Sequence, residues 1–456
     1  MWIRIGVVGV ALAAGALQAE ELKSEAETGA PKVSAAQVIE VPSQLSIEKA
    51  EELLVKNNLA VIAARFGVDA TRAQRIVAAY HPNPTALVQG TQFDLDFPRR
   101  ALTTNSPSAS NRTYLLEFDL PIETNGKRSK RIRTADAQLE ASEAQVLDAV
   151  RQQMFQMKSA YYSAVLAREN TKVATEVLDS VDNTEKLIKR QVAGGNIPES
   201  QLITFQANRI QFEQALVSAQ LSYEQSIRDL LNYLGATPAD VAGAAGAVAV
   251  PDAKPRGLSA VDLSGELTAP PLTVALEELR QKADERPDVV AAQRAVESAE
   301  RSLNVARAGR SPDITVGTQF ARVGADNTGG MTFSVPLPVF NNKEGEIAAA
   351  EALIQSARTQ LKQLHLQALT DIDKAFRAYQ LNQDVMKLYD DSALAKARES
   401  LEIAEKAYER GGTSLLEVLD ARRTFRQTSV ARDQARFNVR QSLLQLELAT
   451  GSAVGK

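Results

Sequence analysis

The sequence contains no cysteine, which excludes disulfides, zinc–thiolate sites and thiol nucleophiles together. Only two histidines, His81 and His365, occur in 456 residues, and this leaves little for general acid–base chemistry. Aromatic residues make up only 5% of the chain although 44% is hydrophobic, a balance typical of long alanine-rich helices rather than of compact cores. The net charge of −4 argues against a nucleic-acid partner.

Motifs of the common enzyme classes are also missing from the sequence. The chain has no phosphate-binding glycine loop, no His-Glu zinc motif and no nucleophile elbow. Met154 and Met157 lie one helical turn apart, but core packing explains this pair better than copper binding. We therefore expect a protein that is not an enzyme and that has no cofactor and no metal site.

The one long apolar run lies at the N-terminus. It covers residues 5–17, follows Arg4, and is too short to span a bilayer as a helix. Ala16 and Ala19 both suit cleavage, so residues 1–19 are predicted to be a secretory signal peptide. No other stretch is long and apolar enough for a transmembrane helix, so the chain is expected to be exported and any membrane span to consist of strands.

The rest of the chain is predicted to be one structural unit written twice. Three pairs of segments match at offsets of 215 to 217 residues: FDLPIETNGKR (118–128) with FSVPLPVFNNKEGE (333–346), VAGGNIPES (192–200) with ERGGTSLLE (409–417), and LLNYLG (230–235) with LELATG (446–451). After the signal peptide, the predicted organisation is an N-terminal linker (20–44), a first repeat (45–235), an inter-repeat linker rich in Ala, Gly and Pro (236–271), and a second repeat (272–451).

Each repeat is predicted to run helix, strand, strand, long helix, glycine break, helix. The opening helices are expected at residues 46–80 and 273–310, with Ser46 as the N-cap of the first. Strands are expected at 85–97, 113–120, 314–320 and 331–337, with polar hairpin loops at 98–111 and 324–330.

The strand patterns place apolar side chains on one face and acidic or amide side chains on the other. The predicted apolar sets are Leu87, Phe93, Leu95 and Phe97; Tyr114, Leu116, Phe118 and Leu120; Ile314, Val316 and Phe320; and Met331, Phe333, Val335 and Leu337. Alternation over roughly 9 to 11 residues is typical of tilted membrane strands. A small soluble sheet packed on helices is the alternative, but its acidic face would then need solvent.

The helices after the strand pairs are predicted to be exceptionally long, at about 130–192 and 344–410. The second of these has 67 residues without a proline, which as a helix is roughly 100 Å. Its apolar residues recur at steps of four and three, the spacing of a coiled-coil seam: Ala350, Ile354, Ala357, Leu361, Leu364 and Ala368, continuing less regularly through Ile372, Phe376 and Tyr379. We expect such alanine-rich rods to pack side by side.

Four membrane strands cannot close a barrel, because the smallest single-chain barrels use about eight. Closure requires several chains, and three chains would supply twelve strands. The predicted fold is therefore α+β, with four membrane strands per chain in a barrel shared among several chains that continues into a long periplasmic helical barrel. A periplasmic coiled-coil scaffold or adhesin is the alternative that keeps the helices without barrel strands.

Two features resemble TolC-type outer-membrane efflux proteins over essentially the whole mature chain. One is the duplicated strand-to-helix junction, and the other is a series spaced as in that family's periplasmic-tip motif: Tyr408, Gly411, Ser414, Glu417, Val418, Leu419, Asp420 and Ala421. The resemblance implies a homotrimer in the lipid of the outer membrane with a large periplasmic part. It implies a passive exit duct that works with a periplasmic adaptor and an RND-type inner-membrane pump.

The segment LPIETNGKRSKR (120–131) further resembles the CzcC-like, heavy-metal branch of that family. This resemblance implies export of heavy-metal cations, and a multidrug or type I secretion duct is the alternative. Five basic residues form a cluster in and just after this segment: Lys127, Arg128, Lys130, Arg131 and Arg133. This cluster would lie at the periplasmic rim of the barrel, where cations meet lipid phosphates, although a solvated helix start is an equal alternative.

Glu417 and Asp420 are the predicted gate and selectivity residues. They lie three positions apart, hence on one helix face, and a trimer would bring six carboxylates to the narrow end of the tube, where they favour cations. The resemblance adds that the matching acidic positions form the periplasmic gate; a solvated helix face is the alternative. Tyr408 matches a tyrosine whose polar contacts hold the closed tip, with packing between helices as the alternative.

Paired glycines are predicted to turn the chain between antiparallel helices. The two turns are the expected contacts for the adaptor: Gly194, Gly195, Asn196, Ile197 and Pro198 in the first, and Gly411, Gly412, Thr413 and Ser414 in the second. Relatives often carry a basic residue where Thr413 stands, so tip closure is expected to rest on contacts other than a salt bridge there.

Overall fold

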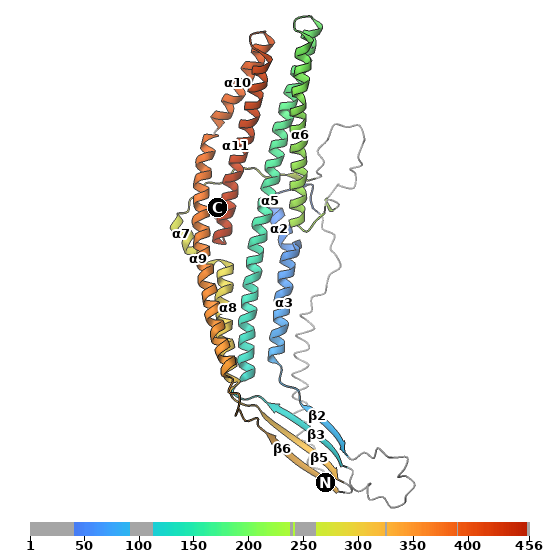
Figure 1. The fold of residues 1–456 in the computed structure, drawn as a ribbon, viewed down its shortest axis with the longest axis vertical. Coiled ribbons are helices and arrows are strands. Elements are labelled where there is room, and N and C mark those ends of the chain that lie inside the picture. Colours follow the sequence, from blue (N-terminus) through green and yellow to red (C-terminus); the bar gives the residue numbers. More distant parts are fainter. Residues whose placement is uncertain are drawn as a thin grey trace, which may run out of the picture. The chain divides into compact units, whose positions relative to one another are not determined.

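The computed structural model describes residues 41–91, 113–237, 240–241, 261–323, 326–389 and 391–453 (Figure 1). The predicted signal peptide, the predicted loop at 98–111 and most of the inter-repeat linker lie outside these residues.

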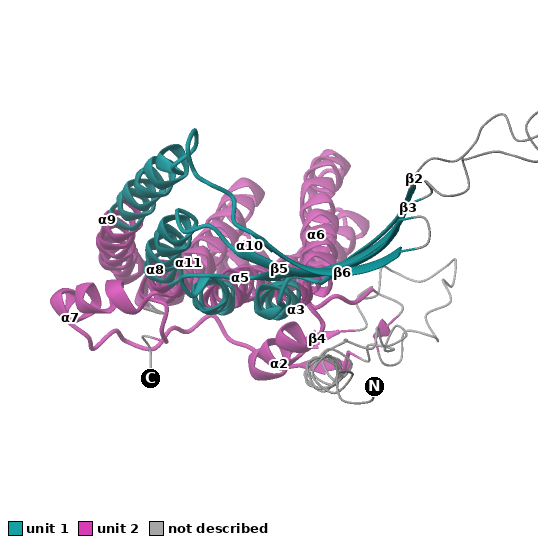
Figure 2. Cartoon of the chain, turned by 90° about the horizontal axis from the view of Figure 1, so that it is seen from below, with its two compact units in different colours: residues 1–32, 67–143, 291–362 teal, residues 33–66, 144–290, 363–456 magenta. Residues whose placement is uncertain are grey.

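The chain divides into two compact units (Figure 2). Among the described residues, unit 1 takes 67–143 and 291–362, and unit 2 takes the remainder. Each unit therefore draws segments from both halves of the chain, because the long helices leave one unit and enter the other.

Unit 1 contains a four-stranded antiparallel sheet, so the prediction of four strands is confirmed. Its order is β2-β3-β5-β6, and each neighbouring pair is antiparallel. The strands are β2 (Thr85–Thr91), β3 (Thr113–Ile122), β5 (Ile314–Val323) and β6 (Asp326–Ser334).

The predicted ends of the last strand are wrong at both sides. β6 begins at Asp326, which pairs with Val323 of β5, so the polar segment 324–330 mostly belongs to the strand rather than to a loop. The strand ends at Ser334 instead of residue 337. Pro336 follows closely and has no backbone N–H to continue the pairing.

The register assigns the two faces of the sheet, because directly paired residues project to the same side. Leu116 of β3 pairs with Val88 of β2 and with Phe320 of β5, so these three residues share one face. Leu87 pairs with Glu117 and therefore lies on the opposite face, contrary to the prediction. The other predicted apolar residues of the first strand, Phe93, Leu95 and Phe97, lie outside the described residues.

The apolar face of β3 is open to the surroundings although β3 is an inner strand. Its residues are between 38% and 52% exposed: Tyr114, Leu116, Phe118, Leu120 and Ile122. The residues that alternate with them are less exposed along the whole strand. The sheet thus presents an uncovered apolar face of about one strand length, which a water-soluble sheet would bury.

Helices make up most of the described chain. In the first half they are α2 (Ile47–Asn57), α3 (Leu59–Ala79), α5 (Lys127–Ala193) and α6 (Glu199–Tyr233). In the second half they are α7 (Leu276–Gln281), the 3-10 turn η4 (Lys282–Glu285), α8 (Pro287–Ala308), α9 (Glu344–Leu388), α10 (Asp391–Glu409) and α11 (Leu415–Thr450). A two-stranded parallel pair, β1 (Gln44–Leu45) with β4 (Asp262–Leu263), lies in unit 2.

The prediction of one unbroken long helix is confirmed for the first repeat only. α5 has 67 residues, while the predicted helix at 344–410 is divided into α9 and α10 after Leu388. Much of the predicted seam is buried on α9, at Ala350, Ile354, Ala368, Ile372 and Tyr379. The seam pattern therefore identified the packed face correctly but not the point where the helix ends.

The two opening helices are also divided, each for a local reason. Ser46 caps α2 as predicted, accepting from the N–H of Lys49, but Asn58 ends that helix and starts α3. Its side-chain oxygen accepts from the N–H groups of Ala60 and Val61 at 3.0 and 3.1 Å, the geometry of an N-cap. In the second repeat, Arg286 is extended because it precedes Pro287, which disfavours helical backbone before it.

Two larger apolar cores lie along the helices of unit 2, beside a small one around Tyr379, Val439 and Leu443. One surrounds the middle of α5 and includes Met157, which is fully buried, with Met154 packed against it, as expected of core methionines. The other surrounds the turns that join α5 to α6 and α10 to α11, and it takes residues from all four helices. Within the described residues, no helix combines the length and the apolar content needed to cross a membrane.

Candidate functional site

Two helix hairpins of unit 2 carry the predicted site. One is α5–α6 and the other is α10–α11, and α5 and α11 lie next to each other between α6 and α10 (Figure 1). Gly195 and Gly411 have φ of 71° and 74°, the left-handed conformation that closes each turn. The N–H of Asn196 bonds the carbonyl of Gln191, and the N–H of Gly412 bonds that of Ala407, so the turns have the same form.

This geometry corrects the offset between the two turns. The sequence match of residues 192–200 with 409–417 places Gly194 opposite Gly411, whereas the backbone conformation makes Gly195 the equivalent of Gly411. Gly235 and Gly451, which end α6 and α11, are related by the same offset and also have positive φ, of 70° and 71°. The duplication therefore extends to the backbone conformation of four glycines.

Glu417 is held at the start of α11 by contacts with two residues of the preceding turn, Thr413 and Ser414. Ser414 is the N-cap, and its hydroxyl accepts from the N–H of Glu417 at 3.4 Å. The hydroxyl of Thr413 donates to the carboxylate of Glu417. Thr413 thus contacts the predicted gate residue as a neutral donor, in place of the basic side chain that relatives often carry there.

Asp420 lies one turn further on the same exposed side of α11. Both Glu417 and Asp420 are exposed, whereas Val418 and Leu419 between them are buried in the core of the hairpin tips. The carboxylate of Asp420 lies 3.5 Å from the guanidinium of Arg423. The two acidic residues therefore share a face, and only Asp420 has a cation beside it.

Tyr408 is buried rather than exposed at the tip surface. Its side chain is 7% exposed and belongs to the apolar core formed by α5, α6, α10 and α11. Its hydroxyl is buried and has no hydrogen-bond partner among the described residues, and this burial raises its pKa. Within one chain, Tyr408 acts through packing.

Sequence reasoning missed a second functional group near the tips, at Arg422. This is the largest fully buried side chain of the described residues, and it contacts two other helices. Its partners are Glu405 of α10 and Ser180 and Thr184 of α5. We call these four residues the Arg422 cluster. A signal was present, because Arg422 follows Val418 by four residues and precedes Phe425 by three, which is an apolar-stripe position.

The basic segment at the start of α5 is used within the chain. Lys127 forms an ion pair with Asp313 at 2.7 Å, Arg131 forms one with Glu123, and the Nε of Arg128 donates to the carbonyl of Ala79 at 2.6 Å. These cations hold the junctions between strands and helices in unit 1. A solvated helix start does not describe these three side chains, and contact of the basic segment with lipid phosphates stays a prediction.

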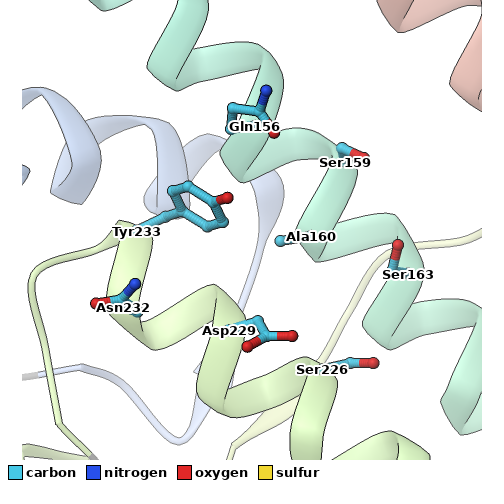
Figure 3. Close-up of a pocket in the computed structure, with 8 residues that line it drawn as sticks. All are labelled: Gln156, Ser159, Ala160, Ser163, Ser226, Asp229, Asn232 and Tyr233. Carbon is cyan, nitrogen blue, oxygen red and sulfur yellow. The ribbon is translucent and has the colours of Figure 1, made fainter.

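A polar groove lies between α5 and α6, away from the tips (Figure 3). Hydroxyl and amide groups line it together with one carboxylate, that of Asp229. Its residues are Gln156, Ser159, Ala160, Ser163, Ser226, Asp229, Asn232 and Tyr233. A single carboxylate among hydroxyls and amides is no acid–base pair, and the described residues contain no cluster of three or more potential metal ligands.

Comparison with known proteins decides the family. A family model described as outer membrane efflux protein matches residues 52–236 and 279–452, which include both hairpins and all four strands of the sheet in unit 1. The chain belongs to this family. The resemblance to TolC-type proteins, carried by the duplicated junction and the tip series, is thereby confirmed.

Two individual relatives match the chain, one over most of its length and one over about a third. It is 25% identical over 398 residues to the cobalt-zinc-cadmium resistance protein CzcC of Cupriavidus metallidurans, a match that covers 86% of each chain. It is 31% identical over 182 residues to the pyoverdine export outer membrane protein OpmQ of Pseudomonas putida, covering 37% of each.

Solved structures share the fold at lower identity. CusC superimposes with a TM-score of 0.69 at 17% identity, covering 93% of this chain and 97% of CusC. VceC of Vibrio cholerae gives 0.67 at 20% identity, covering 90% of this chain and 96% of VceC. The family member described here is accordingly an outer-membrane efflux channel with a large periplasmic part, a transport duct rather than an enzyme.

Proposed function

We propose that three copies of this chain form the exit duct of a tripartite pump and passively export heavy-metal cations. The observation that carries the proposal is the pair of different open edges on the sheet of unit 1. In the described strands β2 pairs only with β3, and β6 pairs only with β5. An open sheet edge has unsatisfied N–H and C=O groups, so the β2 edge of one copy suits the β6 edge of the next.

When the β2 edge of each copy pairs with the β6 edge of the next, the copies form a closed ring if the rotation between neighbouring copies divides a full turn. One chain supplies four strands, whereas membrane barrels need about eight or more. The TolC-type resemblance favours three copies, hence a twelve-stranded barrel. The exposed apolar face of β3 would then face outer-membrane lipid, and the face with Glu117 and Asp119 would line the aqueous interior.

Three copies would bring the exposed face at the start of α11 together around the axis. Glu417 and Asp420 then form a ring of carboxylates, which attracts cations and impedes anions at a constriction. Tyr408 would support the closed tip from inside each chain, since its ring is packed among the four helices. This gives the tip an electrostatic filter without any metal site.

The hairpin turns are the proposed contacts for the periplasmic adaptor, which in turn connects to an RND-type inner-membrane pump. Both Gly195 and Gly411 have open space beside them: apart from the adjacent residues, no heavy atom lies within 4 Å of the position that a Cβ atom would take. The proposed contact residues are Gly194, Gly195, Asn196, Ile197 and Pro198 in the first turn and Gly411, Gly412, Thr413 and Ser414 in the second; most are exposed, whereas Thr413 is half-buried and Ile197 packs against the core of the tips.

Two relatives suggest different substrates. CzcC is named for cobalt, zinc and cadmium resistance and matches along most of the chain, whereas OpmQ is named for pyoverdine export and matches a smaller part. The carboxylates at the tip also favour cations, so we assign heavy-metal cations first. An organic or protein substrate, as in multidrug or type I secretion ducts, is the second candidate.

A deletion strain separates these substrates. The strain is challenged with cobalt, zinc and cadmium salts and with a panel of dyes and antibiotics, and is complemented with the wild-type gene. Sensitivity to the metals alone, restored by the gene, supports the proposal. Sensitivity only to organic compounds supports the second candidate. A protein that is monomeric and water-soluble when purified would overturn the duct itself and favour a periplasmic scaffold.

A further inference from the structure

The Arg422 cluster connects the two hairpins inside unit 2. The Nε of Arg422 lies 3.2 Å from the hydroxyl oxygen of Ser180 on α5 and 3.2 Å from a carboxylate oxygen of Glu405 on α10. Its Nη2 lies 2.7 Å from the same carboxylate oxygen and also donates to the hydroxyl of Thr184. One guanidinium on α11 therefore contacts both α5 and α10.

The partners of Arg422 are also bonded to one another across the hairpins. The hydroxyl of Ser180 donates to Glu405 at 2.6 Å, and the hydroxyl of Thr184 donates to the carbonyl of Ser180 at 3.1 Å. The carbonyl of Ser180 accepts from Arg422 as well, at 3.2 Å. The bond between Arg422 and Glu405 lies within the α10–α11 hairpin, whereas the bonds to Ser180 and Thr184 join that hairpin to α5.

Burial makes this connection costly to break. Arg422 is completely buried, and its neighbours on α11 belong to the apolar core of the tips. A guanidinium separated from its partners there would leave charge unpaired in a medium of low dielectric constant. Burial lowers the pKa of Arg422, and the charge and hydrogen bond of Glu405 act in the opposite direction. The carboxylate of Glu405 therefore stabilises the buried cation.

Near the tips, the other links between the hairpins are more exposed and contribute less, whereas the partly buried links between α5 and α11 at Arg151, Ser159 and Tyr162 lie further from the tips. Arg398 of α10 reaches Glu176 of α5 at 2.9 Å, but both side chains are more than half exposed. Arg423 reaches Asn208 and Gln211 of α6 at 3.3 and 3.4 Å. Exposed pairs of this kind add little to stability because solvent screens them. Among these cross-hairpin links, only the Arg422 cluster is fully buried at its cation.

We propose that Arg422 is the positioning residue of the aperture: by bonding α11 to α5 it fixes how far Glu417 and Asp420 project. Arg422 lies two residues after Asp420 on the same helix, so a shift of α11 against α5 at this level moves both carboxylates. Separation of the hairpins must break its bonds to Ser180 and Thr184. This inference rests on the proposed duct function and adds the residue that holds the tip.

Single-channel recording in planar bilayers tests the inference. Ser180→Ala with Thr184→Val removes the two hydroxyls through which the Arg422 cluster bonds α5, and it leaves the pair of Arg422 and Glu405 and the bond of Arg422 to the carbonyl of Ser180 in place. We expect mean conductance to rise by about twofold or more, because the carboxylates retract from the axis. Thr175→Val is the matched control, since the hydroxyl of Thr175 donates to the carbonyl of Thr171 on its own helix. It should conduct like the wild type.

Substitution of Arg422 itself separates positioning from stability. Arg422→Met keeps the bulk of the side chain without its bonds, and Arg422→Lys keeps the charge without the planar fork that reaches four acceptor atoms on three residues. Conductance per channel should be highest for Met and intermediate for Lys. A role in stability alone would reduce the number of channels and leave conductance per channel at the wild-type value, which would overturn the inference.

A reversible cross-link makes the test independent of how well the variants fold. The chain has no cysteine, so Ser180→Cys with Glu405→Cys provides a unique pair for a short cleavable thiol cross-linker. Conductance should be low when the link is intact and rise when it is cleaved in the same membrane. Equal conductance before and after cleavage would overturn the inference. Absence of any conductance from the wild-type protein would instead overturn the proposed duct function.

Discussion

The carboxylate of Asp420 lies 3.5 Å from the guanidinium of Arg423, one turn further along α11. Arg423 also donates to Asn208 and Gln211 of α6, so it is held beside Asp420 from a neighbouring helix. Glu417 has no such cation and contacts the hydroxyl of Thr413 instead. The two acidic residues of the proposed ring therefore have different neighbours, a cation beside Asp420 and a neutral hydroxyl beside Glu417.

Removal of Arg423 should strengthen the preference of the duct for cations. In Arg423→Ala the carboxylate of Asp420 loses its neighbouring positive charge. The reversal potential in a potassium chloride gradient should therefore shift toward the equilibrium potential of K⁺. Arg410→Ala removes an exposed arginine near the same turn and is the matched control. Identical reversal potentials for Arg423→Ala and Arg410→Ala would place Asp420 away from the ion path.

Gly411→Ala should destabilise the second turn more than Gly412→Ala does. Gly411 has a φ of +74° with open space around it, so Gly411→Ala adds backbone strain alone, about 1–2 kcal/mol. Gly412→Ala meets only an ordinary contact, 3.5 Å from the carbonyl of Ala407, and should change little. Amide hydrogen exchange at residues 405–418 measures both, and equal protection in the two variants would contradict the turn geometry.

Acid should destabilise unit 2 partly through Asp288. Burial alone would raise the pKa of Asp288, but the hydrogen bonds and charge of Arg286, with a contribution from Arg151, hold it below its usual value. A carboxylate with a depressed pKa stabilises the fold above its unfolded pKa of about 3.9, and this contribution is lost as the pH falls through the folded value.

Thermal unfolding between pH 7 and pH 3 measures this contribution. Asp288→Asn should lower the midpoint at pH 7, because the buried Arg286 loses a partner 2.7 Å away, and the loss on acidification should be smaller than in the wild type. Asp384→Asn is the control, since that carboxylate is 68% exposed and pairs with Lys387 on the surface. A wild-type acid response in Asp288→Asn would contradict the assignment.

The two faces of β3 should differ in their tolerance of a charge. Leu116→Arg places a cation on the proposed lipid face, at a cost of about 2–4 kcal/mol near the middle of the membrane, and should reduce assembly in the outer membrane. Glu117→Arg, one residue later, lies on the opposite face and should assemble normally. The amount of each variant in purified outer membranes is the measurement. Equal assembly would contradict the proposed lipid-facing side.

The sequence was sufficient for the turns of the hairpins because glycine and capping residues act locally. The paired glycines predict the two turns, and Ser46 predicts an N-cap for the opening helix; the structure has left-handed glycines at Gly195 and Gly411 and the cap at Ser46. The division of the opening helix was missed because Asn58 is tolerated within a helix, and only its two hydrogen bonds to the following N–H groups show that it acts as a cap.

The faces of the first strand could not be assigned from the sequence alone. Leu87 and Val88 are adjacent and both apolar, so alternation permits either one to face the membrane. The pairing of Val88 with Leu116 decides the question, and that pairing joins residues distant in the chain. Register is a tertiary property, and a shift by one residue exchanges the two faces.

The Arg422 cluster shows the same limit within the candidate site. Glu405 occupies a stripe position four residues after Leu401 and three before Tyr408, just as Arg422 does on α11. Two opposite charges in two apolar stripes indicate a buried pair, but spacing cannot show that α5 completes it. Ser180 and Thr184 are unremarkable in sequence, and their role follows only from the packing of three helices.

Single-channel current through the purified protein tests the central claim most directly, with Glu417→Ala/Asp420→Ala beside the wild type and Glu409→Ala as an exposed acidic control. The wild type and the control should conduct in small steps that trivalent cations block, because the carboxylates narrow the duct and bind them. The double variant should conduct more and resist the block. Equal conductance and equal block in all three proteins would contradict the carboxylate aperture, and the absence of any channel would contradict the duct.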